Sequence, residues 1–461
     1  MSRQKRILEA PFLDTPLPRR SRGSLSSVRP VFQTTQGLVL ENWRRRSNIL
    51  LLSVFFAAAG IPRLSNNFVR VGSLDEAEHL KYEVMLCALG TLVACNMHIL
   101  KRLTVSSLDP LWSFFSVCVI VSGAYNQDLY AVGLGTWCLT GVQLVYFFLI
   151  PAVVLETGKY ALELALIAGS VPYLLASLLL IPIGAGLYQG ITVHPNNIGH
   201  FSIVLAIASL SFLVGGERGR RTSARTLIGG AVLSGCLFLI LMCGSRTSLT
   251  TFGGLVVVAA WIHTKRIGLA GLRSLFLFGC AMIAVAVGTS VLSGVDIGAL
   301  VERLQSKQYQ VTQSGDVLSG RSEMWQDAWN NLNVLGNGSL FFTDRYGLTA
   351  HNSFINVLGM YGLVAFAAFL LYVLLSAFQT VSSAAYRKGS PLAALASFGF
   401  LMMSLGEGMW SGIGNALSIV YFVGWGVHKL RTPRVRRRVS GTSRIPWLRR
   451  QGRQHNECVP G

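Results

Sequence analysis

The chain has 461 residues, of which 51% are hydrophobic and only 13% are charged, and its formal net charge is +20. The hydrophobic residues occur in blocks and do not alternate with polar residues, which excludes a water-soluble core and is typical of a helical membrane protein with many spans. Most of the positive charge lies in short loops and in the two tails, where it orients membrane proteins, so it does not indicate binding to nucleic acid.

The chain begins with a polar arm, residues 1–47, whose Arg, Ser and Pro content predicts a disordered cytoplasmic segment. The first apolar run follows at 48–62. Its basic flank resembles that of a signal peptide, but the preceding arm is too long for one, so we interpret the run as a retained span. The tail, residues 431–461, is also basic, and we expect it to contact anionic lipid head groups.

Apolar runs long enough, or nearly long enough, to cross a membrane recur along the chain. They predict an all-α, polytopic membrane protein with about twelve transmembrane helices: nine over 48–294 and three over 353–430, separated by a large loop over 295–352. Lys and Arg are concentrated on one side of this arrangement, which places both termini in the cytoplasm and the large loop outside. The predicted spans are 48–62, 82–100, 111–124, 130–150, 161–182, 199–214, 226–244, 249–263, 274–294, 353–377, 391–405 and 416–430.

The large outer loop has the composition of a small folded element. Its segment "GRSEMWQDAWNNL", which begins at residue 320, places Met324, Trp325 and Trp329 on one face and polar residues elsewhere. This spacing predicts an amphipathic helix.

Neither the cysteines nor the histidines have the spacing of a metal site. The chain has 8 cysteines, and none of them forms a CxxC pair. His194, His200 and His351 are too scattered to act as a ligand set, and no HExxH motif is present. We therefore predict a site without a metal or another cofactor.

Four polar segments share the outer face in this topology: 190–201, 243–249, 319–325 and 348–354. Arg246 lies in a turn so tight that its guanidinium must be at or below the membrane surface, where a charge is costly and normally faces a cavity or a partner. The alternative is an Arg that reaches up to lipid head groups. The neighbouring hydroxyls favour an anion-binding pocket.

Two further residues have the chemistry of a transferase site. Arg321 paired with Arg246 would hold a phosphate, because guanidinium groups bind phosphoryl oxygens in a bidentate manner; by itself, Arg321 could equally be a solvated helix residue. His351 can accept a proton from a substrate hydroxyl, or it can make a structural hydrogen bond at a helix start. Asn352 has the alternative role of N-cap for the tenth span.

Four short motifs give the chain a family resemblance. They are "HPNN" at 194–197, "SRT" at 245–247, "GRSEMW" at 320–325 and "AHNSFINVLGMYG" at 350–362. In order, side and spacing, this set resembles the O-antigen ligase and polymerase superfamily of bacterial envelope glycan assembly. The resemblance implies an inner-membrane glycosyltransferase that moves a glycan from undecaprenyl pyrophosphate to an acceptor hydroxyl on the periplasmic face, with inversion and without a metal.

Within this interpretation His351, Arg321 and Arg246 are the catalytic candidates. Glu323 and Glu407 are alternative bases. A stacking role for Trp325 on a sugar ring competes with simple packing of the loop. The residues expected to contact the substrate are Arg63, Arg70, Asn196, Trp325 and Asn352.

Three functions remain open from the residues alone. A ligase would transfer the glycan to lipid A-core, whereas a polymerase would use the same chemistry to extend a growing O-antigen or exopolysaccharide chain. A polysaccharide transporter or flippase suits the span count, but such proteins usually have two related halves and binding residues near the membrane midplane. Neither feature is evident in this sequence, which favours the transferase.

Overall fold

The computed structural model describes residues 35–61, 74–102, 108–182, 187–215, 223–268, 321–386, 389–410 and 415–431, together with the single positions 279 and 298. By its internal contacts the chain divides into two units, Met1–Trp43 and Arg44–Gly461. Only the first residues of helix α1 are described in the first unit, so the fold is that of the second unit. Within the described ranges all regular structure is helical, which confirms the all-α prediction.

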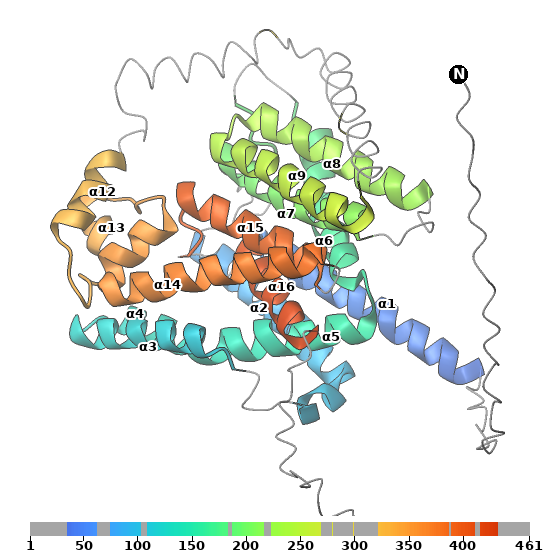
Figure 1. Ribbon diagram of the computed structural model, residues 1–461, viewed down its shortest axis with the longest axis horizontal. Helices are drawn as coiled ribbons and strands as arrows, with labels where there is room; N and C mark the ends of the chain where they lie inside the picture. Colours follow the sequence, from blue (N-terminus) through green and yellow to red (C-terminus); the bar gives the residue numbers. More distant parts are fainter. Residues whose placement is uncertain are drawn as a thin grey trace, which may run out of the picture. The chain divides into compact units, whose positions relative to one another are not determined.

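Figure 1 shows the described helices, coloured in chain order from blue to red. Eleven of the predicted runs coincide with helices, whereas the run 274–294 lies outside the described ranges except for position 279, so the count of twelve spans stays a prediction. The bounds are α1 Thr35–Ala58, α2 Leu74–Cys95, η2 Met97–Arg102, α3 Pro110–Tyr125, α4 Leu129–Trp137, η4 Cys138–Leu149, α5 Ile150–Thr157, α6 Ala161–Leu180, α7 Pro195–Val214, α8 Ser223–Cys243, α9 Arg246–Ile267, α12 Arg321–Asn330, α13 Phe341–Tyr346, α14 Ser353–Ala385, α15 Pro391–Gly406 and α16 Ala416–Arg431.

Five helical stretches of the described chain are long and apolar enough to cross a membrane. Their composition fits a protein embedded in a bilayer, as the sequence predicts. They are Leu129–Thr157, Ala161–Leu180, Pro195–Val214, Arg246–Arg266 and Ser353–Ala385.

Helix α1 begins earlier than the sequence led us to expect. It starts at Thr35, so residues 35–47, which we predicted to be disordered, are helical. The chain has no Pro between Pro30 and Pro62, and the Leu, Glu and Arg residues before Asn48 are good helix formers, so nothing interrupts the helix. Residues 1–34 and the tail from 432 lie outside the described ranges.

An aromatic core joins α3, α14 and α16. The indole of Trp112 is fully buried, and its ring centroid lies 5.0 Å from that of Tyr372 and 4.9 Å from that of Phe422. Its Nε1 donates to the carbonyl oxygen of Cys138 at 2.8 Å, where the π-helix η4 begins. Burying an indole requires such a partner for its N–H, so this bond fixes α3 against the α4–η4–α5 rod.

Helix α14 is not the single straight span that the run 353–377 predicted. Gly362 has a φ of +88°, which interrupts the helix. The rings of Phe354 and Phe369 lie 5.6 Å apart, whereas they would be about 22 Å apart along a straight helix. The first arm, 353–361, therefore doubles back toward the second arm, 363–385.

Backbone groups freed by this break are paired with the segment 331–339. The Leu363 amide donates to the Asn333 carbonyl at 3.0 Å, and the Gly338 amide donates to the Met360 carbonyl at 3.1 Å. Unpaired backbone groups are costly away from water, so this segment makes the break tolerable in an apolar helix. The positive φ of Gly362 disfavours any residue with a side chain.

Candidate functional site

A pocket of about 560 Å³ lies where several helices of the second unit begin or end. Its lining includes residues from three of the four polar segments that the sequence places on one face, 190–201, 243–249 and 319–325, together with the end of α15. The fourth segment, 348–354, reaches the edge of the pocket through the contact of His351 with Glu407. The volume is in the range typical of a small-molecule site. The lining residues are Leu187, His194, Pro195, Asn196, Gly244, Ser245, Arg246, Thr247, Thr250, Arg321, Trp325, Met402, Leu405, Gly406 and Glu407.

Arg246 is the first residue of α9 and reaches the pocket through a tight turn, as the sequence predicts. Gly244 has a φ of +63°, a conformation that glycine adopts without a steric penalty. Ser245 caps the helix, because its hydroxyl oxygen accepts from the Ser248 amide at 3.4 Å. Arg246 is exposed and lines the pocket.

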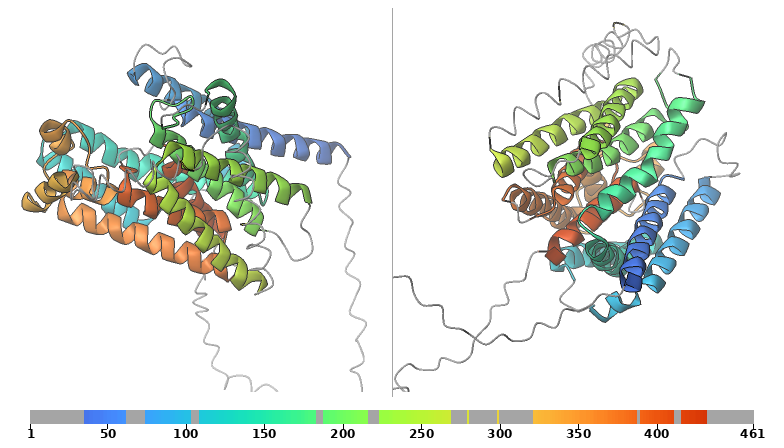
Figure 2. Two further views of the ribbon diagram at one scale, coloured as in Figure 1. Left: turned by 90° about the horizontal axis from the view of Figure 1, so that it is seen from above. Right: turned by 90° about the vertical axis from the view of Figure 1, so that its right-hand side faces the viewer.

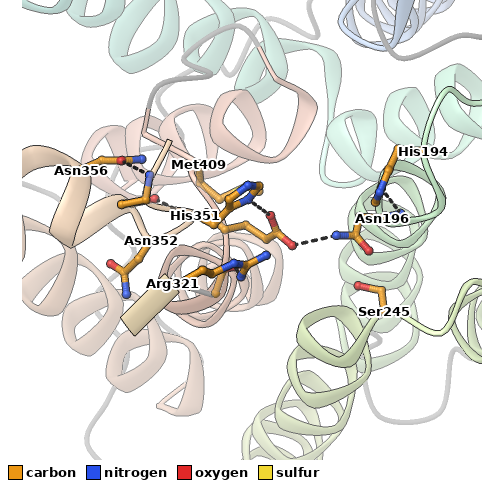
Figure 3. Close-up of polar contacts among 12 residues, drawn as sticks. His194, Asn196, Ser245, Arg321, His351, Asn352, Asn356 and Met409 are labelled. Carbon is orange, nitrogen blue, oxygen red and sulfur yellow. Dashed lines mark hydrogen bonds and ion pairs between the residues drawn. The ribbon is translucent and has the colours of Figure 1, made fainter. Parts of the chain in front are cut away.

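Arg321 lies on the opposite wall of the pocket from the α9 turn, at the start of α12 (Figure 3). Its Nη1 donates to the carbonyl oxygen of Gly406 at 3.2 Å, which ties α12 to the end of α15. One terminal nitrogen is thus used for positioning, whereas a guanidinium has further donors that can reach a ligand. Arg246 and Arg321, which we predicted to act together, line the same pocket.

Three helices direct their N-termini to this pocket: α7, α9 and α12. His194 is the N-cap of α7, and its Nδ1 accepts from the Asn196 amide at 3.1 Å. The N-terminus of a helix carries partial positive charge and unpaired amides, which makes it suited to anions. The helix ends add to the two guanidinium groups, so the pocket favours a negatively charged ligand.

Glu407 is the centre of a hydrogen-bonded cluster at the edge of the pocket. Its Oε1 accepts from Asn196 Nδ2 at 3.2 Å, and its Oε2 lies 3.5 Å from His351 Nδ1. Burial raises the pKa of Glu407, but the His351 hydrogen bond and the charges of His200, His351 and Arg321 outweigh burial and hold that pKa below its ordinary value. Glu407 is therefore a carboxylate near neutral pH.

The contact with Glu407 decides how the ring of His351 can act. With Nδ1 turned to the carboxylate, the proton of the neutral ring is favoured on Nδ1, and Nε2 is left as the acceptor. Figure 3 shows His351 and Arg321 on one side of the site, with Asn196 and Ser245 on the other. A histidine that acts as a general base is often oriented in this way by a neighbouring carboxylate.

The backbone around His351 is held in an unusual conformation. The φ of His351 is +48°, a left-handed conformation that is uncommon for a residue other than glycine. Ala350 is fixed on both sides, since its amide donates to Asn356 Oδ1 at 2.9 Å and its carbonyl accepts from Trp325 Nε1 at 3.0 Å. These bonds hold His351 rigidly beside Glu407.

Several predicted site residues have other positions. Asn352 is the N-cap of α14 and donates to the Leu405 carbonyl at 2.9 Å, so its alternative, structural role is the one observed. Glu323 is exposed on α12, and it is not among the lining residues. Trp325 lines the pocket. Arg63 and Arg70 lie outside the described ranges.

The sequence underestimated Glu407. We predicted it only as an alternative base, whereas it is the residue that joins α7 to the His351 loop. The signal available was its place in "GEGMWSG" just after an apolar run, because a carboxylate at the end of a span is costly unless it is paired. Its partners could not be read from the chain, since Asn196 and His351 are remote in sequence.

Comparison with models of known protein families finds none that matches the chain, and comparison with curated proteins finds no match either. The function of the chain is therefore inferred from the chemistry of the pocket.

Proposed function

We propose that the protein is a membrane glycosyltransferase that moves a glycan from undecaprenyl pyrophosphate to an acceptor hydroxyl, in the manner of an O-antigen ligase. The observation that carries the proposal is the convergence of Arg246, Arg321 and Glu407 on one pocket, with His351 in contact with Glu407. These residues come from separate parts of the chain, since Arg246 and Arg321 are 75 positions apart and His351 and Glu407 are 56 positions apart. Such a set supplies both halves of a glycosyl transfer.

The leaving group determines the need for positive charge. When the bond between the sugar's anomeric carbon and the pyrophosphate oxygen breaks, the electron pair stays on the pyrophosphate, whose negative charge increases. Two guanidinium groups and three helix N-termini at one pocket would stabilise that charge. Metal-independent catalysis is part of the proposal, because the fixed cations do the work that a metal does elsewhere.

The acceptor supplies the other half of the reaction. Its hydroxyl oxygen attacks the anomeric carbon from the face opposite the pyrophosphate, which inverts the configuration, and its proton passes to Nε2 of His351. Glu407 stabilises the imidazolium that forms, because it is a buried carboxylate in contact with Nδ1. His351 is the base in this scheme, and Glu407 is the residue that orients it.

The proposal includes a location. We place the protein in the bacterial inner membrane with about twelve spans, both termini in the cytoplasm and the pocket on the periplasmic side, since the basic residues of the chain follow that orientation. A cysteine at Gln326, an exposed residue of α12, should react with a membrane-impermeant reagent added from outside. Protection of that cysteine in intact cells, with labelling only after lysis, would refute the orientation.

The deciding experiment uses the purified full chain in vesicles with an undecaprenyl-pyrophosphate-linked glycan. Release of undecaprenyl pyrophosphate and glycan transfer are measured with two acceptors, lipid A-core and a second lipid-linked repeat, because ligase and polymerase differ only in the acceptor. Arg246→Ala and Arg321→Ala should lose transfer to either acceptor. Arg345→Ala is the matched control, since Arg345 is an exposed residue that pairs with Asp327 at 2.7 Å. Equal activity of all three variants would refute the proposal.

A further inference from the structure

An uncharged apolar surface lies at the end of the bundle where α14 is interrupted. It consists of large side chains that are all exposed, from 38% for Val364 to 85% for Leu129. We call it the rim patch. Its residues are Tyr125, Leu129, Tyr130, Leu332, Val334, Leu340, Leu363 and Val364.

Hydrogen bonds hold the three parts of the rim patch together. The α3–α4 turn reaches the segment 331–339 through Asn126 Nδ2, which donates to the Gly336 carbonyl at 3.3 Å, and through Asp128 Oδ2, which accepts from the Ser339 amide at 2.6 Å. The same segment pairs with α14 at Leu363. Figures 1 and 2 show α12, α13, the α3–α4 turn and the interrupted end of α14 together at one end of the bundle.

The rim patch continues the apolar surface of the helices below it. On α3, Phe114, Val117 and Val121 are exposed before Tyr125, and on α14, Leu371 and Phe378 are exposed after Val364. Helix α14 is long and apolar enough to cross a membrane, and α3 is a shorter apolar helix. Exposed apolar side chains on such helices face lipid in a membrane protein.

Charge is nearly absent from the elements that form the rim patch. Between Pro110 and Leu155 the chain has a single charged residue, Asp128, and the segments 331–342 and 353–385 have none. Asp128 is used within the protein, as the cap of α4 and as the acceptor for Ser339. The charged residues of the neighbouring element, including Glu323, Asp344 and Arg345, lie on α12 and α13 instead.

We propose that the rim patch is inserted in the bilayer, at the boundary between lipid head groups and acyl chains. Large exposed apolar surfaces mark sites of protein or membrane contact, and Tyr is enriched at the membrane interface. Continuity with the lipid-facing side chains of α3 and α14 favours lipid over a protein partner. This proposal does not depend on the transferase activity.

The rim patch then fixes the depth of the pocket. The first arm of α14 runs from Gly362 at the rim back to Ser353, and nine residues of helix extend about 14 Å. Ser353 lies beside Glu407, since its hydroxyl donates to the Glu407 carbonyl at 3.1 Å. The His351–Glu407 pair is therefore recessed below the level of the rim patch.

The test places a polarity-sensitive fluorophore on single cysteines of the full chain at Leu129, Val334 and Leu340, with Gln326 as the matched control. The natural cysteines that react with the dye are replaced with serine. The protein is reconstituted in phosphatidylethanolamine–phosphatidylglycerol vesicles with brominated acyl chains. Bromine should quench the rim labels at least about twofold more than the label at 326, and aqueous iodide should show the reverse order.

Two results would overturn the proposal. Equal quenching by iodide at all four positions would mean that the rim patch faces water. Protection from iodide without quenching by bromine would mean that a protein surface, such as a second copy, covers it. Leu129 is the safeguard against misfolding, because an 85% exposed side chain has little packing to lose. Since no substrate is present, failure here leaves the proposed activity untouched.

Discussion

Two polar clusters in the second unit differ in how they use charge. Asp109 is 5% exposed, and its carboxylate accepts from Trp425 Nε1 at 3.0 Å and Lys429 Nζ at 3.1 Å, while its own amide donates to Gln143 Oε1 at 2.7 Å. Its other oxygen caps α3 by accepting from the Leu111 and Trp112 amides. This cluster joins α3, η4 and α16 by contacts within the protein.

The pocket cluster is built in the opposite way. Among the lining residues that the structure describes, the one carboxylate, Glu407, is accompanied by two guanidinium groups and three helix N-termini. The difference shows that a polar cluster whose charges are matched inside the protein stabilises the fold, whereas a cluster with an excess of one sign around open volume is suited to a ligand of the other sign. Variants in the two clusters should therefore fail in different ways.

The largest effect is expected for His351→Asn, which tests whether the pocket cluster acts on a substrate. Asparagine tolerates the positive φ at this position better than alanine does, so the variant removes the imidazole without adding backbone strain. Transfer should fall by about 10²–10⁴-fold, the range for loss of a general base. The rate of undecaprenyl pyrophosphate release in vesicles measures it. Wild-type rates in a folded variant would exclude His351 from the chemistry.

Asp109→Ala tests the Asp109 cluster, and we expect it to lower stability without changing activity. Removal of the carboxylate leaves the Lys429 ammonium and the Trp425 N–H without their partner, which should lower the free energy of unfolding by about 3 kcal/mol. Asp109→Asn is the control, because it keeps a cap for α3 and loses only the charge. Thermal unfolding in detergent measures both. A normal rate per folded molecule is expected, and a specific loss of rate would contradict the division into two clusters.

Arg246→Lys tests whether charge alone is sufficient at this position of the pocket, because it keeps the positive charge and removes the planar guanidinium. Bidentate contact with a phosphoryl group should be lost, so the rate should fall by about 10–100-fold, or ~1.4–2.7 kcal/mol. The unfolding temperature should not change, since the residue is exposed at the start of α9. If lysine restores the full rate, a point charge is sufficient and the bidentate role is wrong.

Glu407→Gln removes the charge of the carboxylate that orients His351, and its effect on the stability of the fold should depend on pH. The folded-state pKa of Glu407 lies below its ordinary value of 4.5, so the ionised form stabilises the fold above that pH, and this contribution disappears as the pH falls through the folded-state pKa. Wild type should be more stable than the variant at neutral pH, and the difference should shrink below pH 4.5. Unfolding temperatures across pH measure this difference, and a gap that grows in acid would contradict it. Transfer at neutral pH should fall by about tenfold.

The smallest effect is expected for Arg345→Ala. Its side chain is 45% exposed and pairs with Asp327 on the surface, so the change in the free energy of unfolding should be within about 0.5 kcal/mol. The transfer rate should also stay at the wild-type value. A clear loss of activity would place Arg345 in the ligand site and would weaken the distinction between this surface arginine and the two arginines that line the pocket.

Helix positions were predictable because apolar runs and their flanking polar residues are local signals. The sequence also predicted that Arg246 lies in a tight turn and that the segment beginning at residue 320 is an amphipathic helix, which is observed as α12. The buried face of that helix was predicted less well: Met324 is buried, but Trp329 is 52% exposed and Ala328 takes its place. A stripe of large residues does not reveal which of them the neighbouring helix covers.

The interruption of α14 was not predictable in the same way. Glycine is common in the apolar runs of membrane helices, so its presence does not predict an interruption. Nothing in the local sequence shows that backbone groups near Gly362 pair with the segment 331–339, which precedes the helix. Asn196, His351 and Glu407 likewise come together only through the packing of α7, α14 and α15. The chemistry of each residue was readable, whereas their contacts required the fold.

The doubled-back arm of α14 also acts as a spacer. Its length between Gly362 and Ser353 sets how far the imidazole of His351 lies from the rim patch, so one added helical turn would move the His351–Glu407 pair by about 5.4 Å relative to that patch. A lipid-linked donor has its phosphates at a height fixed by its own anchor. If the protein acts as proposed, the number of residues in this short arm decides whether the donor's phosphates and His351 lie at the same depth.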